Sequence, residues 1–508
     1  MAQRAVAINP TKPGGIVAGL VLALTLGTLG AVAWRADWGR GLGAADWAAV
    51  RFTVTQALVS AGLSCLLAIP VARALARRRF WGRSVLVTLL GAPFLLPVIV
   101  AVLGLLAVFG RNGILNDALG ALGLPEVSIY GFHGVVLAHV FFNLPLVTRL
   151  ILQGWLSIPA ERFRLAASLD APVGRLLERP MLRTVLPPAF LIVFLICLTS
   201  FAVALTLGGG PRATTVELAI YQALRFDFDL GRAAMLASIQ FGLCSIAAAL
   251  AWRMTAVDGF GAGLDRSVDR WDGSRWGDAV VIALAATFLL VPLIMVIVRG
   301  VPGLLELPVD ILRAALRSVT IAVISAALCI GLTLALALKG GRIVGLVGVL
   351  PLATSSLVVG TGLFLLVYPI VNPAKLALVV TALVNAVLAL PFALRSVAPA
   401  VDKITSDYAR LGAILDMSTW VWTTRVILPR LRRPLGFAAG LAAALSMGDL
   451  GVIALFAGDA QETLPLAMYR LMGAYRMDAA AGAALVLLVL SFALFWICDR
   501  GGRVDADL

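Results

Sequence analysis

The chain has 508 residues, of which 61% are hydrophobic and only 13% are charged, with a formal net charge of +14 and a mean hydropathy of +0.99. A soluble domain has about 25% charged residues, so this composition excludes an ordinary soluble protein and indicates a polytopic membrane protein. The positive charge is scattered over short segments between apolar runs, without zinc-ligand spacing or an RNA-binding motif, so no nucleic-acid partner is expected.

Apolar runs of about 20 residues predict an all-α fold with about twelve membrane-spanning helices in the lipid bilayer. Six runs precede a polar stretch and six follow it: Ile16–Trp34, Phe52–Val71, Val85–Phe109, His133–Gln153, Phe190–Leu207, Ala233–Trp252, Ala279–Val298, Val319–Leu338, Val344–Val371, Leu376–Arg395, Phe437–Ala457 and Ala479–Ile497. The alternative for the first run is a cleaved signal peptide, because basic residues precede it and Ala31-Val32-Ala33 resembles a cleavage site. The six-plus-six arrangement favours a span.

Basic residues predict the orientation, because Lys and Arg in short loops tend to stay in the cytoplasm. With both termini placed inside, 28 of the 41 Lys and Arg residues fall in cytoplasmic segments and 13 in external ones. The segment Arg73–Arg83 carries five of the 28. Both termini are therefore expected to be cytoplasmic.

One phrase occurs twice, as RLAASLD at Arg164–Asp170 and as RLGAILD at Arg410–Asp416, 246 residues apart. At this spacing, nine of the 27 positions from Leu144 to Asp170 are identical. The chain is therefore expected to be a duplicated unit. The predicted organisation is a first transmembrane repeat at 1–253, a cytoplasmic linker at 254–276 and a second repeat at 277–508. Because each repeat has an even number of spans, a pseudo-twofold axis along the membrane normal is expected to relate them.

Each copy of the phrase is predicted to lie in a short cytoplasmic helix. Ser157 precedes the first copy, and Thr405 and Ser406 precede the second, so their side-chain oxygens are expected to cap the two helices. The alternative is that both loops are only connecting turns. Recurrence in register, with Arg and Asp at the two ends of each phrase, favours a shared function.

The two loops resemble the cytoplasmic loops of permease subunits of ATP-binding-cassette importers, which read Glu-Ala-Ala, three residues, Gly, then hydrophobic-x-Leu-Pro further on. The second copy matches the downstream part with Val426-Ile427-Leu428-Pro429. Both copies depart from the pattern, because Arg164 and Arg410 replace the acidic residue and Asp170 and Asp416 replace the glycine. Asp adopts a left-handed turn at a cost of about 1 kcal/mol, so these loops are expected to turn differently from the pattern.

A longer resemblance runs from about Val50 to Phe495. LTLGGGPRATTVELAIYQAL at Leu205–Leu224 and LSMGDLGVIALF at Leu445–Phe456 look like the fused, two-halved permease of the bacterial thiamine importer. That resemblance implies a type I importer fold in the inner membrane and the import of thiamine and its phosphate esters. It also implies two copies of a separate ATP-binding subunit at the cytoplasmic loops and a periplasmic thiamine-binding protein outside.

The chain is expected to be a transport subunit and not an enzyme. None of its four lysines follows a glycine, so it lacks the Gly-x-x-x-x-Gly-Lys-Ser/Thr loop that holds nucleotide phosphates. ATP hydrolysis is therefore expected on a separate chain. The five cysteines and two histidines have no ligand spacing, so no metal site and no cofactor are expected.

The resemblance points to eight residues for contact with the ATPase: Arg164, Leu165, Ala166, Asp170, Arg410, Leu411, Gly412 and Asp416. The small Ala166 and Gly412 are expected to allow close seating in a groove of the ATPase. The two arginines are expected to pair with carboxylates on its surface.

Candidates for the translocation pathway are Asp449 and the flanking Gly448 and Gly451. A carboxylate inside an apolar span is costly, so a functional role is the first hypothesis. Asp449 is expected to meet a cationic cargo, or alternatively to hydrogen bond a neighbouring helix or lie near the membrane interface. The candidates for contact with the binding protein are Gly209, Gly210, Arg212 and Glu217, with an ordinary external loop as the alternative.

Two rival functions share much of this pattern. A twelve-span secondary transporter would also have parallel halves, but it is expected to bury coupling charges, and apart from Asp449 the spans contain almost none. A fused permease of a ferric-iron importer has a similar layout with another cargo. A membrane-embedded enzyme is disfavoured, because the spans contain no catalytic pair.

Overall fold

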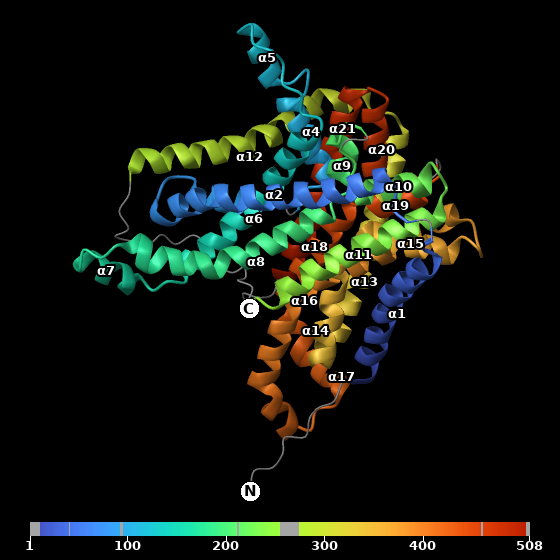
Figure 1. The fold of residues 1–508 in the computed structure, drawn as a ribbon. Coiled ribbons are helices and arrows are strands. Elements are labelled where there is room, and N and C mark those ends of the chain that lie inside the picture. The colour runs from blue at the N-terminus through green and yellow to red at the C-terminus, as the bar shows by residue number, and fades with distance from the viewer. Residues whose placement is uncertain are drawn as a thin grey trace. The chain divides into compact units, whose positions relative to one another are not determined.

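The computed structural model describes residues 11–39, 41–91, 95–210, 213–254, 274–458 and 461–503 (Figure 1). The helices before the polar stretch are α1 (Thr11–Arg35), α2 (Ala44–Arg77), α3 (Arg83–Leu89), α4 (Val98–Phe109), α5 (Ile114–Ala121), α6 (Phe132–Leu156), α7 (Ala160–Ser168), the π-helical η2 (Gly174–Glu178), α8 (Arg179–Leu198), α9 (Ala202–Leu207), α10 (Val216–Arg225) and α11 (Leu230–Trp252). Those after it are α12 (Arg275–Gly303), η4 (Leu304–Glu306), α13 (Asp310–Lys339), α14 (Arg342–Val349), η5 (Leu350–Ala353), α15 (Ser356–Val367), η6 (Pro373–Leu376), α16 (Ala377–Ile414), α17 (Thr419–Val421), the π-helical η7 (Trp422–Ile427), α18 (Leu428–Met447), α19 (Gly451–Phe456), α20 (Leu464–Gly473) and α21 (Met477–Arg503).

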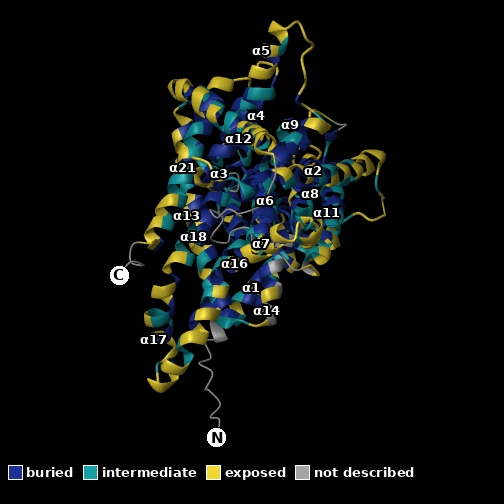
Figure 2. Cartoon of the chain, turned by 90° about the vertical axis from the view of Figure 1, so that its left-hand side faces the viewer, coloured by how far each residue is buried: buried dark blue, intermediate teal, exposed yellow. Residues whose placement is uncertain are grey.

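Burial differs strongly between these helices. α6 packs against α2 and α8, and Figure 2 shows it as mostly buried, whereas α5 and α17 are largely exposed. Phe141 and Trp155 of α6 are among the largest fully buried side chains. A helix that is apolar on all sides, such as α6, is expected at the centre of a bundle.

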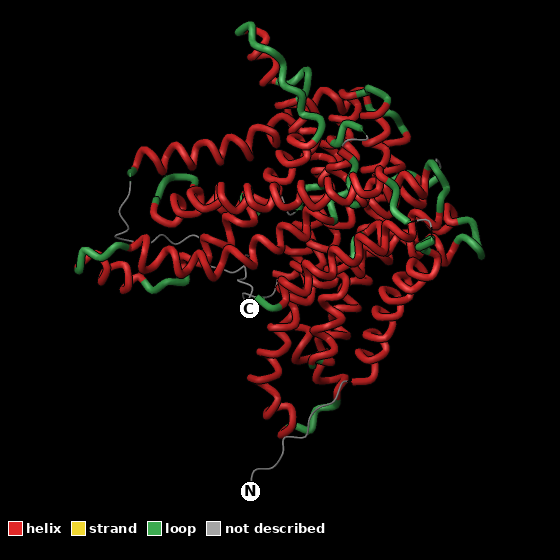
Figure 3. Tube along the Cα trace, in the orientation of Figure 1, coloured by secondary structure: helices red, strands yellow, loops and turns green. Residues whose placement is uncertain are grey.

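The described residues are predominantly helical and contain no strand (Figure 3), which confirms the prediction of an all-α polytopic membrane protein. Eleven helical segments among them are long and apolar enough to cross a membrane. The predicted span Val344–Val371 is instead divided into α14 and α15, and Ser355 caps the new helix by accepting a hydrogen bond from the Val358 N–H at 3.0 Å. With 12 residues, α15 is about 18 Å long, shorter than the hydrocarbon core.

Helices recur in the same order in both sequence repeats. α8 and α18 each have 20 residues and begin 249 positions apart, from Arg179 to Leu428. A short break follows each of them, and α9 and α19, with 6 residues each, begin at the same spacing. The structure therefore repeats its elements as the sequence repeats its phrase.

The chain forms two compact units that do not coincide with the predicted repeats. One consists of Met1–Arg40, Ile220–Phe241 and Glu306–Leu508, and the other of Gly41–Ala219 and Gly242–Leu305. The first predicted span, α1, therefore belongs with α13 and α15, against which it packs (Figure 1). The seventh predicted span, α12, belongs with α2 and α4. The two repeats exchange their first helices.

Close backbone contacts explain how the exchanged helices pack. A Cβ on Gly362 of α15 would lie 2.5 Å from the Thr28 carbonyl oxygen of α1, and one on Gly104 of α4 would lie 2.5 Å from the Pro292 carbonyl oxygen of α12. Both contacts require glycine. The repeat boundaries and the pseudo-twofold axis stay predictions, and most of the predicted linker at 254–276 lies outside the described residues.

Candidate coupling loops and polar clusters

The first repeated phrase lies in α7, which a break separates from α6. Pro159 stands at the N-cap of α7, and a proline disfavours a helical conformation for the residue before it, so α6 ends at Leu156. The Ser157 hydroxyl donates a hydrogen bond to the Gly154 carbonyl at 2.7 Å. The prediction that Ser157 caps the loop helix is therefore wrong.

The second phrase lies at the end of a 38-residue helix, α16, and not in a separate short helix. Thr405 occupies the place of Pro159 at the 246-residue spacing, so nothing interrupts the backbone hydrogen bonds there. Thr405 and Ser406 lie inside α16, and the Ser406 hydroxyl donates to the Lys403 carbonyl at 2.8 Å. Their predicted capping role is also wrong.

Both phrases end in the same backbone turn. Asp170 has φ of 47° and Asp416 has φ of 46°, which places both in the left-handed region. The Ala171 N–H donates to the Ala166 carbonyl at 2.8 Å, and the Met417 N–H donates to the Gly412 carbonyl at 3.0 Å. These are Schellman-type helix ends, in which glycine is the usual left-handed residue. The expectation that Asp would make the loops turn differently is therefore wrong.

The two turns expose matching apolar side chains. Leu165 and Leu169 are 59% and 68% exposed, and their counterparts Leu411 and Leu415 are 52% and 61% exposed. Arg164 and Arg410, one residue before the first leucine of each pair, are exposed as well. Each turn thus presents one arginine beside two leucines one helical turn apart.

The two small residues of the phrase face the other way. Ala166 and Gly412 are buried, and their carbonyls accept the hydrogen bonds that close the turns. In this structure a partner's groove therefore cannot contact these two residues directly.

Among the described residues, the exposed arginine of the first turn makes one weak ion pair. Arg164 Nη2 lies 3.7 Å from Glu161 Oε1, and both side chains are more than half exposed. An exposed ion pair at this distance contributes about 0–1 kcal/mol. Arg164 is therefore available to a partner's carboxylate.

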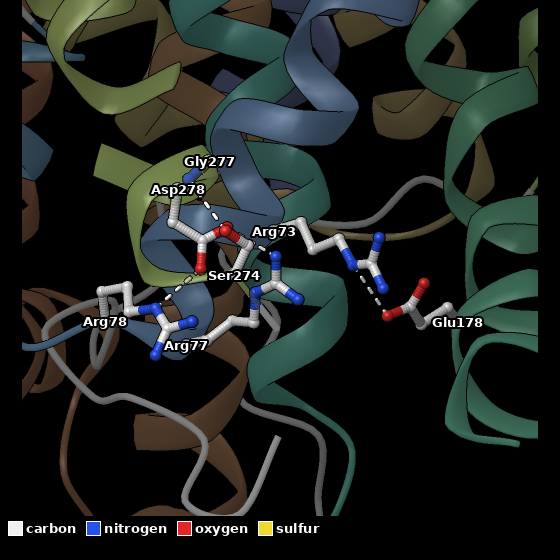
Figure 4. Close-up of polar contacts among 7 residues, drawn as sticks. All are labelled: Arg73, Arg77, Arg78, Glu178, Ser274, Gly277 and Asp278. Atoms are coloured by element: carbon white, nitrogen blue, oxygen red, sulfur yellow. Dashed lines mark hydrogen bonds and ion pairs between the residues drawn. The ribbon is translucent and has the colours of Figure 1, made fainter. Parts of the chain in front are cut away.

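An ion-pair cluster joins α2, η2 and α12 (Figure 4). Arg77 Nη2 lies 2.5 Å from Asp278 Oδ1, and Arg78 Nε lies 2.6 Å from Asp278 Oδ2, while the Asp278 side chain is only 6% exposed. Arg73 Nε lies 2.9 Å from Glu178 Oε1, on the segment that follows the first turn. Sequence reasoning used these arginines only for orientation and missed the cluster. The signal was Asp278, an acidic residue directly before a predicted span.

A polar cluster surrounds Asp449 in the second repeat. The carboxylate lies in the break between α18 and α19, where the Gly451 N–H donates to Asp449 Oδ1 at 3.3 Å. Oδ2 is inaccessible to solvent and has no hydrogen-bond partner among the described residues. Asn385 interacts with the carboxylate and donates to the Ser446 hydroxyl at 3.1 Å, which in turn lies 3.0 Å from the Ser325 hydroxyl.

The two glycines predicted to flank the pathway, Gly448 and Gly451, differ in their surroundings. A Cβ on Gly451 would lie 2.5 Å from the Ser356 hydroxyl, so a larger residue there would require the Ser356 side chain to move. Gly448 is the C-cap of α18, and its N–H donates to the Ala444 carbonyl at 3.3 Å. Both glycines therefore shape the break that carries Asp449.

A second polar cluster, missed by sequence reasoning, occupies equivalent places in the first repeat. A hydrogen bond of 3.3 Å joins Ser60 Oγ and His139 Nδ1, and Asn143 donates to the His139 carbonyl at 2.8 Å. Gln56 donates to the Cys197 carbonyl at 2.9 Å. His139 matches Asn385 at the 246-residue spacing, and Cys197 matches Ser446 at 249. Aligning the repeats at both spacings, 246 and 249, would have shown that the two clusters occupy equivalent positions.

The four predicted external contact residues do not form one surface. Gly209 and Gly210 have φ of 72° and 123°, conformations that favour glycine, and they follow the C-cap of α9. Glu217 is fully buried, so it offers no surface to a binding protein here. Arg212 lies outside the described residues. The described part of the chain also contains no group of three or more His, Cys, Asp or Glu able to hold a metal ion.

Comparison with known proteins identifies the family. No protein-family model matches the chain. The chain is 40% identical to the thiamine transport system permease protein ThiP of Salmonella typhimurium, over 97% of each chain. It is 40% identical to the protein of the same name from Escherichia coli, over 98% of this chain and 99% of the relative, and 39% identical to that of Brucella abortus, over 96% and 95%. These relatives support neither the ferric-iron permease nor the secondary transporter. The chain belongs to the family of thiamine transport system permease proteins.

Proposed function

We propose that this chain is the membrane-spanning permease subunit that carries thiamine and its phosphate esters inward across the bacterial inner membrane. The names of the relatives support the cargo. The excess of basic residues on one side supports two cytoplasmic termini. The observation that carries the proposal is the pair of matched turns, which present the same exposed surface 246 residues apart.

Two copies of a separate ATP-binding subunit are proposed to receive the two turns, one turn each. Every turn is closed by backbone hydrogen bonds, so it can transmit force as a rigid element. The leucines Leu165, Leu169, Leu411 and Leu415 are proposed to bury in the ATPase, while Arg164 and Arg410 pair with its carboxylates. Asp170 and Asp416 occupy the left-handed positions at which the two turns end.

The coupling proposal is tested by charge reversal in the reconstituted importer. The permease is combined with its ATP-binding subunit and a thiamine-loaded binding protein, and stimulated ATP hydrolysis is measured. Arg164→Glu with Arg410→Glu is expected to lower stimulation by about tenfold or more, since close charge pairs couple by at least 1.5 kcal/mol. The control is Arg313→Glu, an exposed arginine at the start of α13. Equal losses in both proteins would refute the coupling surface.

Asp449 is proposed to meet the positively charged ring of the cargo during passage. A buried carboxylate oxygen without a hydrogen-bond donor is unfavourable, and a passing cation would compensate it. Asn385 and Ser446 hold the other groups of the cluster in place. Ser200 stands at the matching position of the first repeat, so that repeat carries no carboxylate there.

Substitution at the two matching positions tests this contact. Asp449→Asn is expected to lower thiamine uptake by about tenfold, the effect of losing one charged contact of about 1.5 kcal/mol. The same change is not expected to lower the unfolding temperature, because an unpaired buried charge is removed. Ser200→Asn is the matched control and should leave uptake unchanged. Uptake that survives Asp449→Asn would favour the alternative role in hydrogen bonding a neighbouring helix.

The binding protein is proposed to dock beside the turn at Gly209 and Gly210. These residues follow Gly208, the C-cap of the short helix α9, where a Cβ would lie 2.4 Å from the Ala204 carbonyl oxygen. Glu217 is not part of this surface, because it is buried. Gly210→Ala is expected to weaken stimulation by the loaded binding protein while leaving basal ATP hydrolysis unchanged.

A further inference from the structure

A groove of about 580 Å³ lies along the exchanged helix α1. It is lined by residues of α1, by the start of α11 and by the end of α15, all within one compact unit: Gly27, Gly30, Ala31, Trp34, Arg35, Leu230, Leu365, Leu366, Tyr368 and Pro369. The lining is apolar along most of its length. One end carries an arginine and two aromatic rings.

The polar end of the groove is built from side chains typical of a membrane–water interface. Trp34 is 93% exposed and Tyr368 is 45% exposed. The Tyr368 ring stacks on Phe364 with ring centroids 5.8 Å apart and meets the edge of Phe228 at 5.4 Å. Trp and Tyr concentrate at the level of lipid headgroups, so the opposite end of the groove points toward acyl chains.

Arg35 supplies the charge that selects the occupant. Among the described residues no carboxylate forms an ion pair with its guanidinium, and the side chain is exposed. A phosphate group is the natural partner of a guanidinium at an interface. A cation such as thiamine would be repelled, so the groove is not a cargo site.

We propose that this groove binds one phospholipid, with its phosphate beside Arg35 and an acyl chain along Gly27, Gly30 and Leu366. Both glycines face open space, since a Cβ at either position would meet no atom within 4 Å. A bound lipid would fill the groove between α1, α11 and α15. This site is independent of the cargo and coupling proposals.

Lipid retention by the purified full-length chain tests the site. The chain is delipidated, titrated separately with phosphatidylglycerol and with diacylglycerol of the same chains, and examined by native mass spectrometry. Gly30→Leu is expected to fill the groove and abolish the most tightly retained phosphatidylglycerol. Gly19→Leu is the matched control, since it lies on α1 outside the groove and a Cβ there also meets no atom within 4 Å.

Arg35→Gln separates the phosphate contact from the apolar contact. One basic residue near a membrane surface changes binding by about fivefold, so retention of phosphatidylglycerol should fall by that factor while that of diacylglycerol stays the same. Equal retention in Gly30→Leu and Gly19→Leu would overturn the proposal, as would an equal effect of Arg35→Gln on both lipids. Displacement of the lipid by inorganic phosphate alone would overturn it in favour of a free-phosphate site.

Discussion

The two repeats share the backbone geometry of their loop turns and helix breaks, and they differ in the polar side chains that they bury. The left-handed turns at Asp170 and Asp416 recur, as do the breaks after α8 and α18. At these same breaks the first repeat has Ser200 where the second has Asp449. The elements proposed to face two copies of one ATPase are alike, whereas the residues proposed to face an asymmetric cargo are not.

The two repeats also share a buried hydrogen bond between a hydroxyl and a backbone N–H. Thr53 of α2 accepts a hydrogen bond from the N–H of Val216, the first residue of α10, at 2.8 Å. Ser318 of α13 accepts one from the N–H of Leu464, the first residue of α20, also at 2.8 Å. The residue type changes from Thr to Ser, but a hydroxyl accepts the first N–H of α10 and of α20 in both cases.

The exchanged helices are held by different interactions in the two units, and the largest predicted effect follows from this difference. Asp278→Asn leaves Arg77 and Arg78 without their carboxylate at the start of α12. Removing one partner of a buried ion pair costs about 3 kcal/mol, which should appear as a lower free energy of unfolding in mixed micelles. Asp310→Asn is the matched control in the first turn of α13, where the side chain is 86% exposed. Its cost should stay below about 1 kcal/mol, and equal costs would show that the Asp278 cluster does not anchor α12.

The shared hydroxyl bond predicts an intermediate effect in both repeats. Thr53→Val and Ser318→Ala each leave a buried backbone N–H without its acceptor, which costs about 1–3 kcal/mol of unfolding free energy. Thr53→Ser and Ser318→Thr keep the hydroxyl and should be close to wild type. If only one of the two deletions destabilised the protein, the hydroxyls would not be equivalent.

Local sequence patterns predicted the helical fold and the two loops, because apolar length and repeated phrases are properties of short segments. The exchange of α1 and α12 could not be predicted, since it depends on long-range packing such as that of Gly104 against Pro292. The predicted capping role of Thr405 and Ser406 was wrong because both residues can also lie inside a helix, and α16 continues through them. The cluster around His139 was missed because its match to the second repeat needs the spacing to change from 246 to 249 within the loop.

The left-handed aspartates predict a small gain in both loops. Asp170→Gly and Asp416→Gly remove the Cβ that disfavours this conformation and should each raise the free energy of unfolding by about 1 kcal/mol or less. Asp170→Ala and Asp416→Ala keep a Cβ without the polar side chain and should lower it instead. Stimulated ATP hydrolysis should be unchanged in the glycine variants. A loss of stimulation would show that the carboxylates contact the ATPase directly.

The smallest expected change concerns a backbone difference at the start of the two loops. Pro159 is exposed and separates α6 from α7, whereas α16 runs unbroken past Thr405. Pro159→Ala should let the new N–H bond to the Trp155 carbonyl, so that α6 continues into α7 and hydrogen exchange slows at positions 157–160. An exposed substitution of this kind should alter the free energy of unfolding by only about 0.5 kcal/mol. The matched control, Thr405→Ala, should leave both the free energy of unfolding and the rate of hydrogen exchange unchanged. If exchange stays fast after Pro159→Ala, the break is held by packing of buried Phe163 and not by the proline, and the two loops differ in tertiary contacts as well as in sequence.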